Sequence, residues 1–252
     1  MKVLINNQLV EYSDEGSGRV LLFLHGWGAN LKTFDSLAKH FTDKFRVIRL
    51  DFPGFGGSPK PENDWFIDDY SRLTADFLEK INASDVYAIV AHSFGGRVTI
   101  RCSSANYLNP KKIVLMGAAG IKPRKTFKMI VYKVIAKIGK FLTSLSLLKK
   151  LQPLLRKKLY SSIGNTDYSQ ANDMKKIFVN TINEDLLPEL SKIKQTTLLI
   201  WGENDQETPL SDANLMSDLI KSSKLKVIPS AGHFVYADAL DKTKKYMDDF
   251  LL

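Results

Sequence analysis

The sequence predicts an α/β fold in which a mostly parallel, doubly wound sheet carries an inserted helical cap. Two observations predict it. Short apolar runs alternate with helical patterns along most of the 252 residues, and one long central stretch interrupts that alternation. Runs that are apolar at every position suit strands buried on both faces, and helices placed between such strands imply parallel pairing.

The expected strands begin with a hairpin over residues 2–13, where apolar and polar residues alternate around Asn6 and Asn7. Six apolar runs follow, each ending in a glycine-rich or polar loop, at 20–24, 45–50, 86–91, 113–116, 197–201 and 225–228. Helical patterns lie between them at 70–81, 94–106, 209–220 and 236–252. Pro209 stands at the expected first turn of the third of these helices, a position that suits proline.

Residues 121–188 contain no convincing strand. Apolar residues recur there at helical spacing and lysines fill the positions between them, as in an amphipathic helix. The apolar members are Phe127, Ile130, Val131, Val134, Ile135, Ile138 and Leu142. We therefore expect a core of residues 1–120 and 189–252, with a helical cap of residues 121–188 inserted between two strands of its sheet.

Cysteine content and hydropathy favour a cytoplasmic protein. The chain has one cysteine, Cys102, so no intrachain disulfide can form and nothing indicates an oxidising compartment. The first residues lack the long apolar region of a signal peptide, and no run of about 18 apolar residues predicts a membrane span. The sequence carries no signal for an oligomeric state.

The net charge of +9 is concentrated in one segment of the expected cap. Residues 122–158 hold twelve Lys and Arg and no Asp or Glu. Three interpretations stay open: a solvated helical face, contact with an anionic membrane surface, or attraction of an acidic small ligand. No nucleic-acid partner is expected, because the aromatic and glycine patterns of common binding modules are missing.

Co-sedimentation with phosphatidylserine-containing vesicles tests the membrane interpretation. Each Lys or Arg near an anionic leaflet contributes roughly 1 kcal/mol, so about three or four engaged together predict binding at low salt that is lost at high salt. If the protein stays in the supernatant at low salt, the membrane interpretation is wrong. The basic residues would then form a charged outer face of the cap.

The sharpest local signal is an apolar run that turns directly into a helical pattern at Ser93. The segment Val90-Ala-His-Ser-Phe-Gly-Gly96 makes this joint. Small residues two before and two after a serine leave room for the abrupt turn that exposes its hydroxyl, an arrangement known as a nucleophile elbow. Ala91 stands where the usual form has glycine, and it is small enough for the turn. Ser93 is therefore the expected nucleophile rather than a simple helix N-cap.

A serine hydroxyl becomes a good nucleophile only when a base takes its proton, and four histidines are available. His233 follows the last strand and precedes the last helix, so its loop emerges at the same carboxyl edge of the sheet as Ser93. His92 adjoins the serine, and its side chain should point elsewhere. His25 is expected to orient its own loop, and His40 to be solvated at a polar helix end. We therefore expect His233 to be the base.

The base needs a carboxylate that holds its tautomer, and the loop after the seventh expected strand offers three. Glu203 lies closest to the strand end and Asp205 at the apex of the loop. Glu207 lies at the helix start, where it can favour the helix dipole. Any of the three would give the chain order serine, acid, histidine, so the residues alone leave the choice open.

Acyl transfer also requires hydrogen-bond donors for the oxyanion. The backbone N–H of Phe94, at the start of the helix after Ser93, is one expected donor. The second is expected from the loop after the third strand, His25-Gly-Trp-Gly28, through the backbone N–H of Trp27. The Trp27 side chain can pack in the core at the same time, because only its backbone donates.

Over essentially its full length the chain resembles the α/β-hydrolase superfamily, in its capped serine hydrolase branch. The resemblance rests on these segments, in order: His25-Gly-Trp-Gly28, Asp51-Phe-Pro-Gly-Phe-Gly-Gly-Ser58, Ala91-His-Ser-Phe-Gly-Gly96, Gly202-Glu-Asn-Asp205 with Pro209, and Gly232-His233. In that branch the acid is the aspartate of a G-x-x-D motif, which implies Asp205. The segment from Asp51 to Ser58 is a structural loop in the family, so no catalytic role is expected for it.

The resemblance implies a hydrolase that works through a Ser93–His233–Asp205 triad and an acyl-enzyme, with no metal or organic cofactor. Its substrate would be a small molecule with an ester or related acyl bond, and the apolar face of the cap suggests an apolar acyl group. A carboxylesterase is the first expectation. Lactonases and carbon–carbon bond hydrolases of vinylogous diketones belong to the same branch. A non-catalytic scaffold with this fold is the alternative from a different class.

Overall fold

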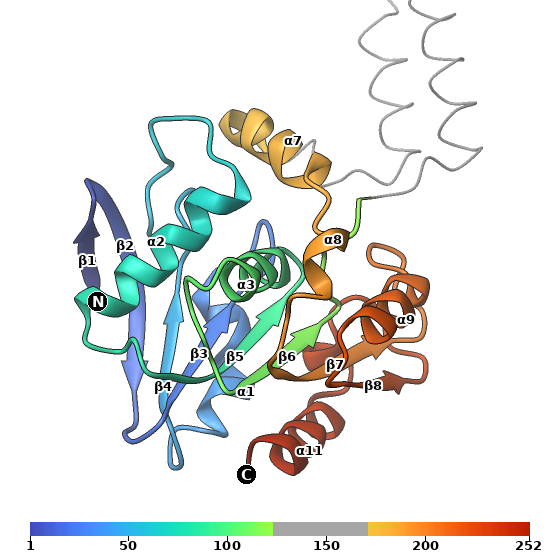
Figure 1. The fold of residues 1–252 in the computed structure, drawn as a ribbon. Coiled ribbons are helices and arrows are strands. Elements are labelled where there is room, and N and C mark those ends of the chain that lie inside the picture. Colours follow the sequence, from blue (N-terminus) through green and yellow to red (C-terminus); the bar gives the residue numbers. More distant parts are fainter. Residues whose placement is uncertain (123–170) are drawn as a thin grey trace, which may run out of the picture. The chain divides into compact units, whose positions relative to one another are not determined.

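A computed structural model describes residues 1–122 and 171–252 of the chain (Figure 1). The chain divides into two compact units, Met1–Lys122 together with Val179–Leu252, and Pro123–Phe178. The first unit contains the whole sheet. Most of the expected cap at 121–188 lies outside the described residues, as do its apolar stripe and all of its basic segment except Lys122.

Eight strands form one sheet in the order β1-β2-β4-β3-β5-β6-β7-β8 (Figure 1). β1 pairs with β2 and β2 with β4 in antiparallel fashion, and every other pair of neighbours is parallel. The strands are β1 (Lys2–Ile5), β2 (Gln8–Glu15), β3 (Val20–Leu24), β4 (Arg46–Leu50), β5 (Val86–His92), β6 (Lys112–Met116), β7 (Thr196–Gly202) and β8 (Ser223–Ile228). The mostly parallel sheet predicted from the alternation of patterns is confirmed.

The opening hairpin turns at the two asparagines that the sequence indicated. Asn6 and Asn7 have φ values of 45° and 67°, and Ile5 pairs with Gln8 across the turn. Asparagine tolerates this left-handed region better than most residues. The two-residue loop therefore sets the register that places Val10 of β2 in the core.

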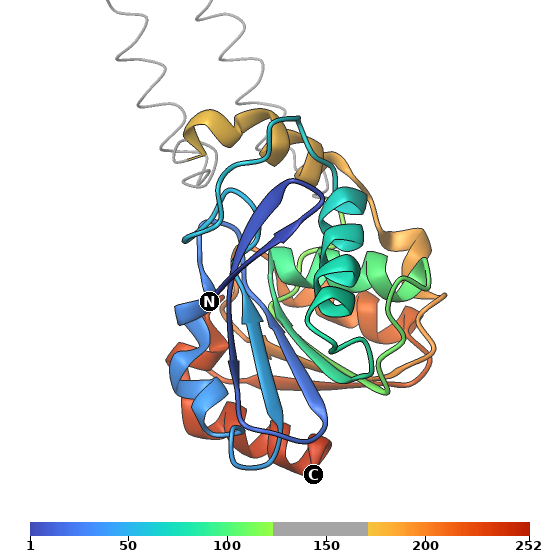
Figure 2. The same cartoon turned by 90° about the vertical axis from the view of Figure 1, so that its left-hand side faces the viewer.

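Helices cover both faces of the sheet, which confirms the doubly wound arrangement (Figures 1 and 2). One face carries α2 (Ile67–Lys80), α3 (Phe94–Ser104) and α9 (Leu210–Leu219). The other carries α1 (Asp35–Lys39) and α11 (Leu240–Leu251), whose apolar residues join the strands in one buried cluster. Its larger members include Phe23, Phe34, Phe41, Phe45, Met116, Met247 and Leu251. This packing holds the strand ends in place and, with them, the loops that follow β5, β7 and β8.

Some helix boundaries differ from the sequence prediction. The expected helix at 236–252 is two helices, α10 (Val235–Asp238) and α11, because Ala239 adopts a non-helical backbone with φ −145° and ψ 58°. Pro209 has an extended backbone with ψ 154° and caps α9 instead of forming its first turn. Short helices were not predicted, since a few residues cannot display a helical period. These are η1 (Leu31–Phe34) and α1. Within the segment 121–188 that was expected to be helical, the structure has η3 (Asn172–Met174), α7 (Lys175–Asn183) and the start of α8 (Leu187–Leu190).

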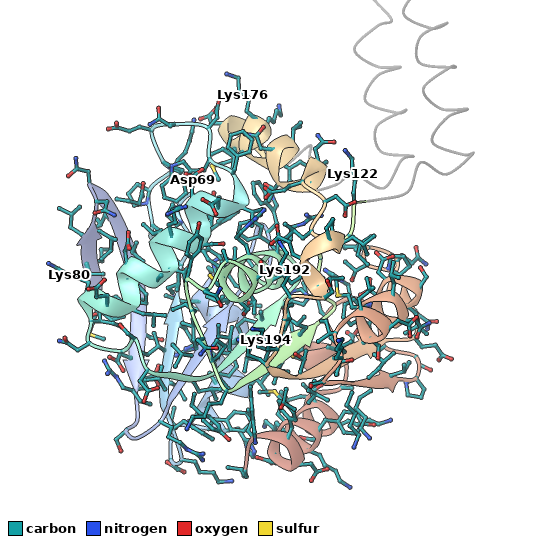
Figure 3. The ribbon with its side chains drawn as sticks, viewed as in Figure 1. Asp69, Lys80, Lys122, Lys176, Lys192 and Lys194 are labelled. Atoms are coloured by element: carbon teal, nitrogen blue, oxygen red, sulfur yellow. The ribbon has the colours of Figure 1, made fainter. Side chains whose placement is uncertain are left out.

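Charged side chains mark the surface of the first unit. Lys80 at the end of α2, and Lys192 and Lys194 ahead of β7, are all exposed (Figure 3). Within residues 1–122 and 171–252, no helix combines the length and the hydrophobicity needed to cross a bilayer.

Candidate active site

Ser93 occupies a strained turn between β5 and α3. Its backbone has φ 48° and ψ −110°, in a region that residues with a side chain rarely adopt. The turn is held from both sides, because Ser93 N–H donates to the Met116 carbonyl and the Ser93 carbonyl accepts from Ala119 N–H at 3.0 Å. This is the geometry of a nucleophile elbow, and the Ser93 side chain is only half-buried, so its hydroxyl can be reached.

Two glycines after Ser93 let the elbow pack against its neighbours. A Cβ on Gly95 would lie 2.2 Å from the Leu24 carbonyl oxygen, and a Cβ on Gly96 would lie 2.5 Å from the Ala118 Cβ. No side chain fits at either place without moving backbone or a packed neighbour. The close approach also allows Gly95 N–H to donate to the His25 carbonyl at 3.0 Å, which ties the elbow to the loop after β3.

His233 and Asp205 meet in a buried hydrogen bond at the carboxyl edge of the sheet. β7 and β8 run parallel to β5, so the loops that follow all three emerge at the same edge (Figure 1). His233 Nδ1 lies 2.9 Å from Asp205 Oδ2, and both residues are less than a tenth exposed. Because a carboxylate only accepts, His233 must carry its proton on Nδ1, which leaves Nε2 as the basic nitrogen.

Asp205 is held by several further donors. Oδ1 accepts the backbone N–H groups of Glu207 and Thr208, each at 2.9 Å, and Thr208 Oγ1 lies 2.8 Å from Oδ2. Burial alone would raise the pKa of Asp205, but the hydrogen bonds and charge of His233 and the bonds from Thr208 outweigh it and hold that pKa below its ordinary value. The carboxylate is therefore charged and oriented toward His233 at neutral pH.

The three acids of this loop have distinct surroundings. Glu203 is exposed and accepts the Ser230 backbone N–H at 3.1 Å. The Glu207 carboxylate lies 3.5 Å from His233 Nε2, on the side of the ring opposite the nitrogen that an orienting acid would bond. Asp205 alone among the three bonds the Nδ1 side of the histidine ring. Thr208 was also missed, because a threonine beside a proline carries no sequence signal for orienting a carboxylate.

The backbone around the elbow offers a donor for an oxyanion. Phe94 N–H opens α3, and in the part of the chain that the structure describes it meets no acceptor. Likewise, Ser93 Oγ has no hydrogen-bond partner among the described residues, as is common before a substrate binds. The Trp27 ring packs edge-on against the rings of Phe94 and Phe55, with centroids 5.5 and 4.9 Å away, so the loop after β3 borders the elbow.

His25 orients that loop, as the sequence predicted. Its Nε2 accepts the Phe52 backbone N–H at 3.0 Å, so Nδ1 carries the proton and donates to the Gly26 carbonyl at 2.7 Å. Burial lowers the pKa of His25 to about 4, against the bond to Gly26, which raises it. Asp51 has the structural role expected for its loop, since its carboxylate accepts the backbone N–H groups of Leu31 and Gly57.

One histidine departs from the sequence interpretation. His40 is not simply solvated, because its Nε2 lies 2.8 Å from an oxygen of Asp248 and the side chain is 31% exposed. The two residues are 208 positions apart, and this pair joins the end of α1 to α11 on the face of the sheet away from α3. His92 does point away from the nucleophile, into a buried position between neighbouring loops.

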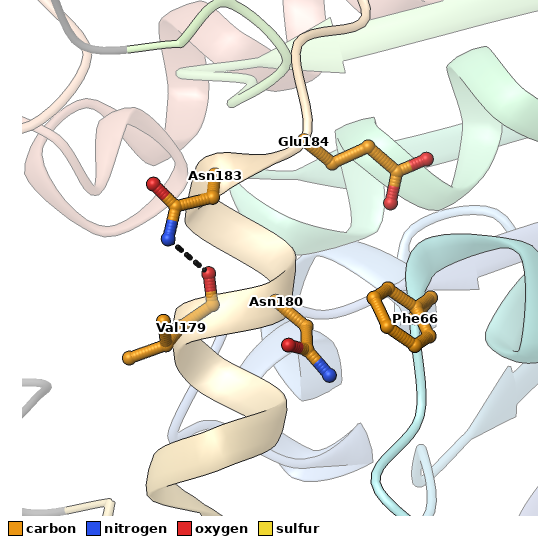
Figure 4. Close-up of a pocket in the computed structure, with 5 residues that line it drawn as sticks. All are labelled: Phe66, Val179, Asn180, Asn183 and Glu184. Atoms are coloured by element: carbon orange, nitrogen blue, oxygen red, sulfur yellow. Dashed lines mark hydrogen bonds between the residues drawn. The ribbon is translucent and has the colours of Figure 1, made fainter.

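A surface cavity of about 460 Å³ lies beside α7 and the loop before α2. It is lined by Phe66, Val179, Asn180, Asn183 and Glu184 (Figure 4). Asn183 Nδ2 donates to the Val179 carbonyl, and the Glu184 carboxylate is paired with Arg101. None of Ser93, Asp205 and His233 lines this cavity, so it is separate from the candidate active site.

Two relatives of similar sequence are named as hydrolases. The chain is 27% identical over 244 residues to the 2-hydroxy-6-oxo-6-(2'-aminophenyl)hexa-2,4-dienoic acid hydrolase of Metapseudomonas resinovorans, covering 88% of this chain and 80% of that protein. It is 23% identical over 236 residues to the pimeloyl-[acyl-carrier protein] methyl ester esterase of Nitrosomonas europaea, covering 86% and 90%.

Solved structures share the fold. The esterase of Exiguobacterium antarcticum superposes with a TM-score of 0.76 at 22% identity, over 99% of this chain and 98% of that one. The model of the alpha/beta hydrolase family matches residues 21–244. That span includes the elbow at Ser93, the loop of Asp205 after β7 (the acid loop) and the loop of His233 after β8 (the histidine loop). The chain therefore belongs to the alpha/beta hydrolase family.

Proposed function

We propose that this protein is a serine hydrolase that cleaves an ester bond of a small substrate with an apolar acyl group. Ser93 is the nucleophile, His233 the general base and Asp205 the residue that orients it. The backbone N–H groups of Phe94 and Trp27 bind the oxyanion. The observation that carries the proposal is the buried 2.9 Å bond between His233 and Asp205, at the same sheet edge as the strained turn at Ser93.

The mechanism follows from these positions. His233 Nε2 takes the Ser93 hydroxyl proton while Oγ attacks the acyl carbonyl carbon, and Asp205 stabilises the resulting imidazolium. The carbonyl oxygen becomes an oxyanion held by the two backbone donors. The C–O bond to the alcohol then breaks, His233 returns its proton to the leaving oxygen, and an acyl-Ser93 ester remains. A water activated by His233 attacks this ester and releases the acid and free Ser93.

The preference for an apolar acyl group is supported by an exposed aromatic ring beside His233. Phe234 is 46% exposed, and its ring centroid lies 5.3 Å from that of His233. A large exposed aromatic beside a buried base offers apolar surface to a ligand and would otherwise face water. The Nitrosomonas europaea relative, an ester esterase by name, agrees with this choice of bond.

A carbon–carbon bond hydrolase is the second candidate, and one observation favours it. The Metapseudomonas resinovorans relative, 27% identical over 88% of this chain, is a hydrolase named for a dienoic acid with a 6-oxo group. In that case the bond that breaks would lie between the carbonyl carbon and a neighbouring carbon.

A substrate panel distinguishes the candidates. We expect p-nitrophenyl esters of graded acyl length to be hydrolysed, with kcat/KM at least about tenfold above that for a vinylogous diketone, and we expect a fluorophosphonate probe to label Ser93. The tenfold margin corresponds to roughly 1.4 kcal/mol of transition-state stabilisation. Turnover of the diketone alone would favour the carbon–carbon hydrolase. Absence of both labelling and turnover would show a non-catalytic scaffold.

A further inference from the structure

His92, the last residue of β5, stands directly before Ser93 and is 1% exposed. Its Nε2 lies 3.1 Å from the backbone carbonyl oxygen of His233. A carbonyl only accepts, so the proton of this imidazole sits on Nε2 and is donated to His233. The residue that precedes the candidate nucleophile thus bonds the main chain of the candidate base, 141 positions later in the sequence.

The other ring nitrogen of His92 has no partner among the described residues. Nδ1 is fully buried and makes no hydrogen bond within the described part of the chain. A buried acceptor without a donor lowers stability, and an apolar side chain of similar size at this position would avoid that cost. Such a side chain would, however, leave the His233 carbonyl without the donor from Nε2. The arrangement therefore retains one bond to the histidine loop at the expense of an unpaired atom.

The ring of His92 fills the space between two loops of the candidate site. On one side its centroid lies 4.6 Å from the His233 ring, 5.2 Å from Phe234 and 5.0 Å from Tyr236. On the other side is the loop after β3, where a Cβ on Gly26 would lie 2.8 Å from His92 Nδ1 and 3.3 Å from the Ser93 Cβ. One rigid ring thus spaces the histidine loop from the loop that holds Trp27.

His92 is neutral at neutral pH. Burial, followed by the charge on His233 when that ring is protonated, lowers the pKa of His92 to about 3. The tautomer with hydrogen on Nε2 is therefore a constant donor and does not titrate with the base.

We propose that His92 is a positioning residue for the reaction. Its Nε2–H fixes the main chain of His233, and its ring sets the separation between His233 and the loop after β3, which holds Trp27. This inference rests on the proposed function. It does not give His92 a role in proton transfer, because Nε2 is bonded to the His233 carbonyl and Nδ1 is buried.

Two substitutions of similar polarity separate positioning from packing. In His92→Gln the longer side chain can bring its amide N–H to the place of Nε2, whereas in His92→Asn the amide is one methylene too short. We expect His92→Asn to lower kcat about 10- to 100-fold with KM changed less than about threefold, since a displacement near 1 Å of a catalytic group has effects of this size. His92→Gln should recover kcat to within about fivefold of the wild type.

A control variant and a spectroscopic readout complete the experiment. Tyr236→Phe keeps the ring against His92 and removes a buried hydroxyl that has no partner among the described residues, so it tests packing without touching the donor. The low-field NMR resonance of the His233 Nδ1 proton, bonded to Asp205, reports the position of the base directly. We expect it in the wild type, Tyr236→Phe and His92→Gln, and expect it to broaden or vanish in His92→Asn.

The outcomes distinguish the two proposals. If the wild type turns over no ester, the proposed function is wrong, and the resonance still tests the position of His233. If kcat and the resonance in His92→Asn match those in His92→Gln, the positioning role is wrong. A parallel fall of melting temperature and activity in all three variants, with the resonance unchanged, would likewise show that His92 only packs.

Discussion

Ser93→Ala is expected to lower kcat for ester hydrolysis by roughly 10⁴–10⁶-fold, because Ser93 Oγ is the group that forms the acyl-enzyme in the proposed mechanism. The melting temperature should change little. Ser93 Oγ makes no hydrogen bond among the described residues and is only half-buried, so its removal leaves no partner unsatisfied. Alanine also keeps the same backbone strain at φ 48°. Steady-state turnover of the best ester in the panel, with thermal unfolding of both proteins, measures both effects.

Ser103→Ala provides the matched control for Ser93→Ala. Ser103 lies in the same helix, α3, and its buried Oγ has no partner in the part of the chain that the structure describes. The substitution therefore removes a hydroxyl at the far end of the helix that follows the elbow, without touching the proposed chemistry, and turnover should stay within about twofold of the wild type. If the Ser93→Ala protein still hydrolysed ester within tenfold of the wild-type rate, Ser93 would not be the nucleophile.

Asp205→Asn is expected to lower kcat by roughly 10³–10⁴-fold. The loss of activity follows from the hydrogen-bond donors around the Asp205 side chain, which fix the orientation of an asparagine there. Two backbone N–H groups, those of Glu207 and Thr208, point at Oδ1, so the amide oxygen of an asparagine must stay there. Its NH₂ group then faces His233 Nδ1 and donates to it. This moves the histidine proton to Nε2, which can no longer accept the proton of Ser93.

The control for this substitution is Glu203→Gln, which changes an exposed acid in the same loop. Among the described residues, its carboxylate accepts only the Ser230 N–H, and a glutamine oxygen can accept that bond as well. We expect turnover within about threefold of the wild type, as for most surface changes away from a site. A large loss in Glu203→Gln together with near-normal kinetics in Asp205→Asn would transfer the role of the acid to Glu203.

Local patterns in the chain were sufficient to predict the strands of the sheet and the elbow. Continuous apolar runs mark strands because a strand covered on both faces has no polar side, and Ser93 is recognisable because only small neighbours permit its turn. The candidate base could also be predicted from the sequence. His233 could be selected from its place after the last strand, since the loops after parallel strands meet at one edge.

Side-chain partners far apart in sequence were not predictable. The bond from His92 to the His233 carbonyl, the 3.5 Å approach of Glu207 to His233 Nε2 and the pair of His40 with Asp248 each join separate elements. No periodicity encodes such a contact, because it depends on how loops of different strands are directed once the sheet has formed. The break at Ala239 is similar, since the pattern of apolar residues continues through it while the backbone does not.

The residue pattern alone predicted the class of fold, the position of the candidate nucleophile and the three acids from which one must be chosen. A family resemblance implied Asp205, but the residues of the loop left Glu203 and Glu207 as equals. The folded chain was needed to identify the carboxylate that bonds His233 Nδ1, because that depends on the direction of each side chain from one short loop. Thr208 and two backbone N–H groups of the same loop set that direction for Asp205, and the pairing of β7 with β8 brings this loop to the loop of His233.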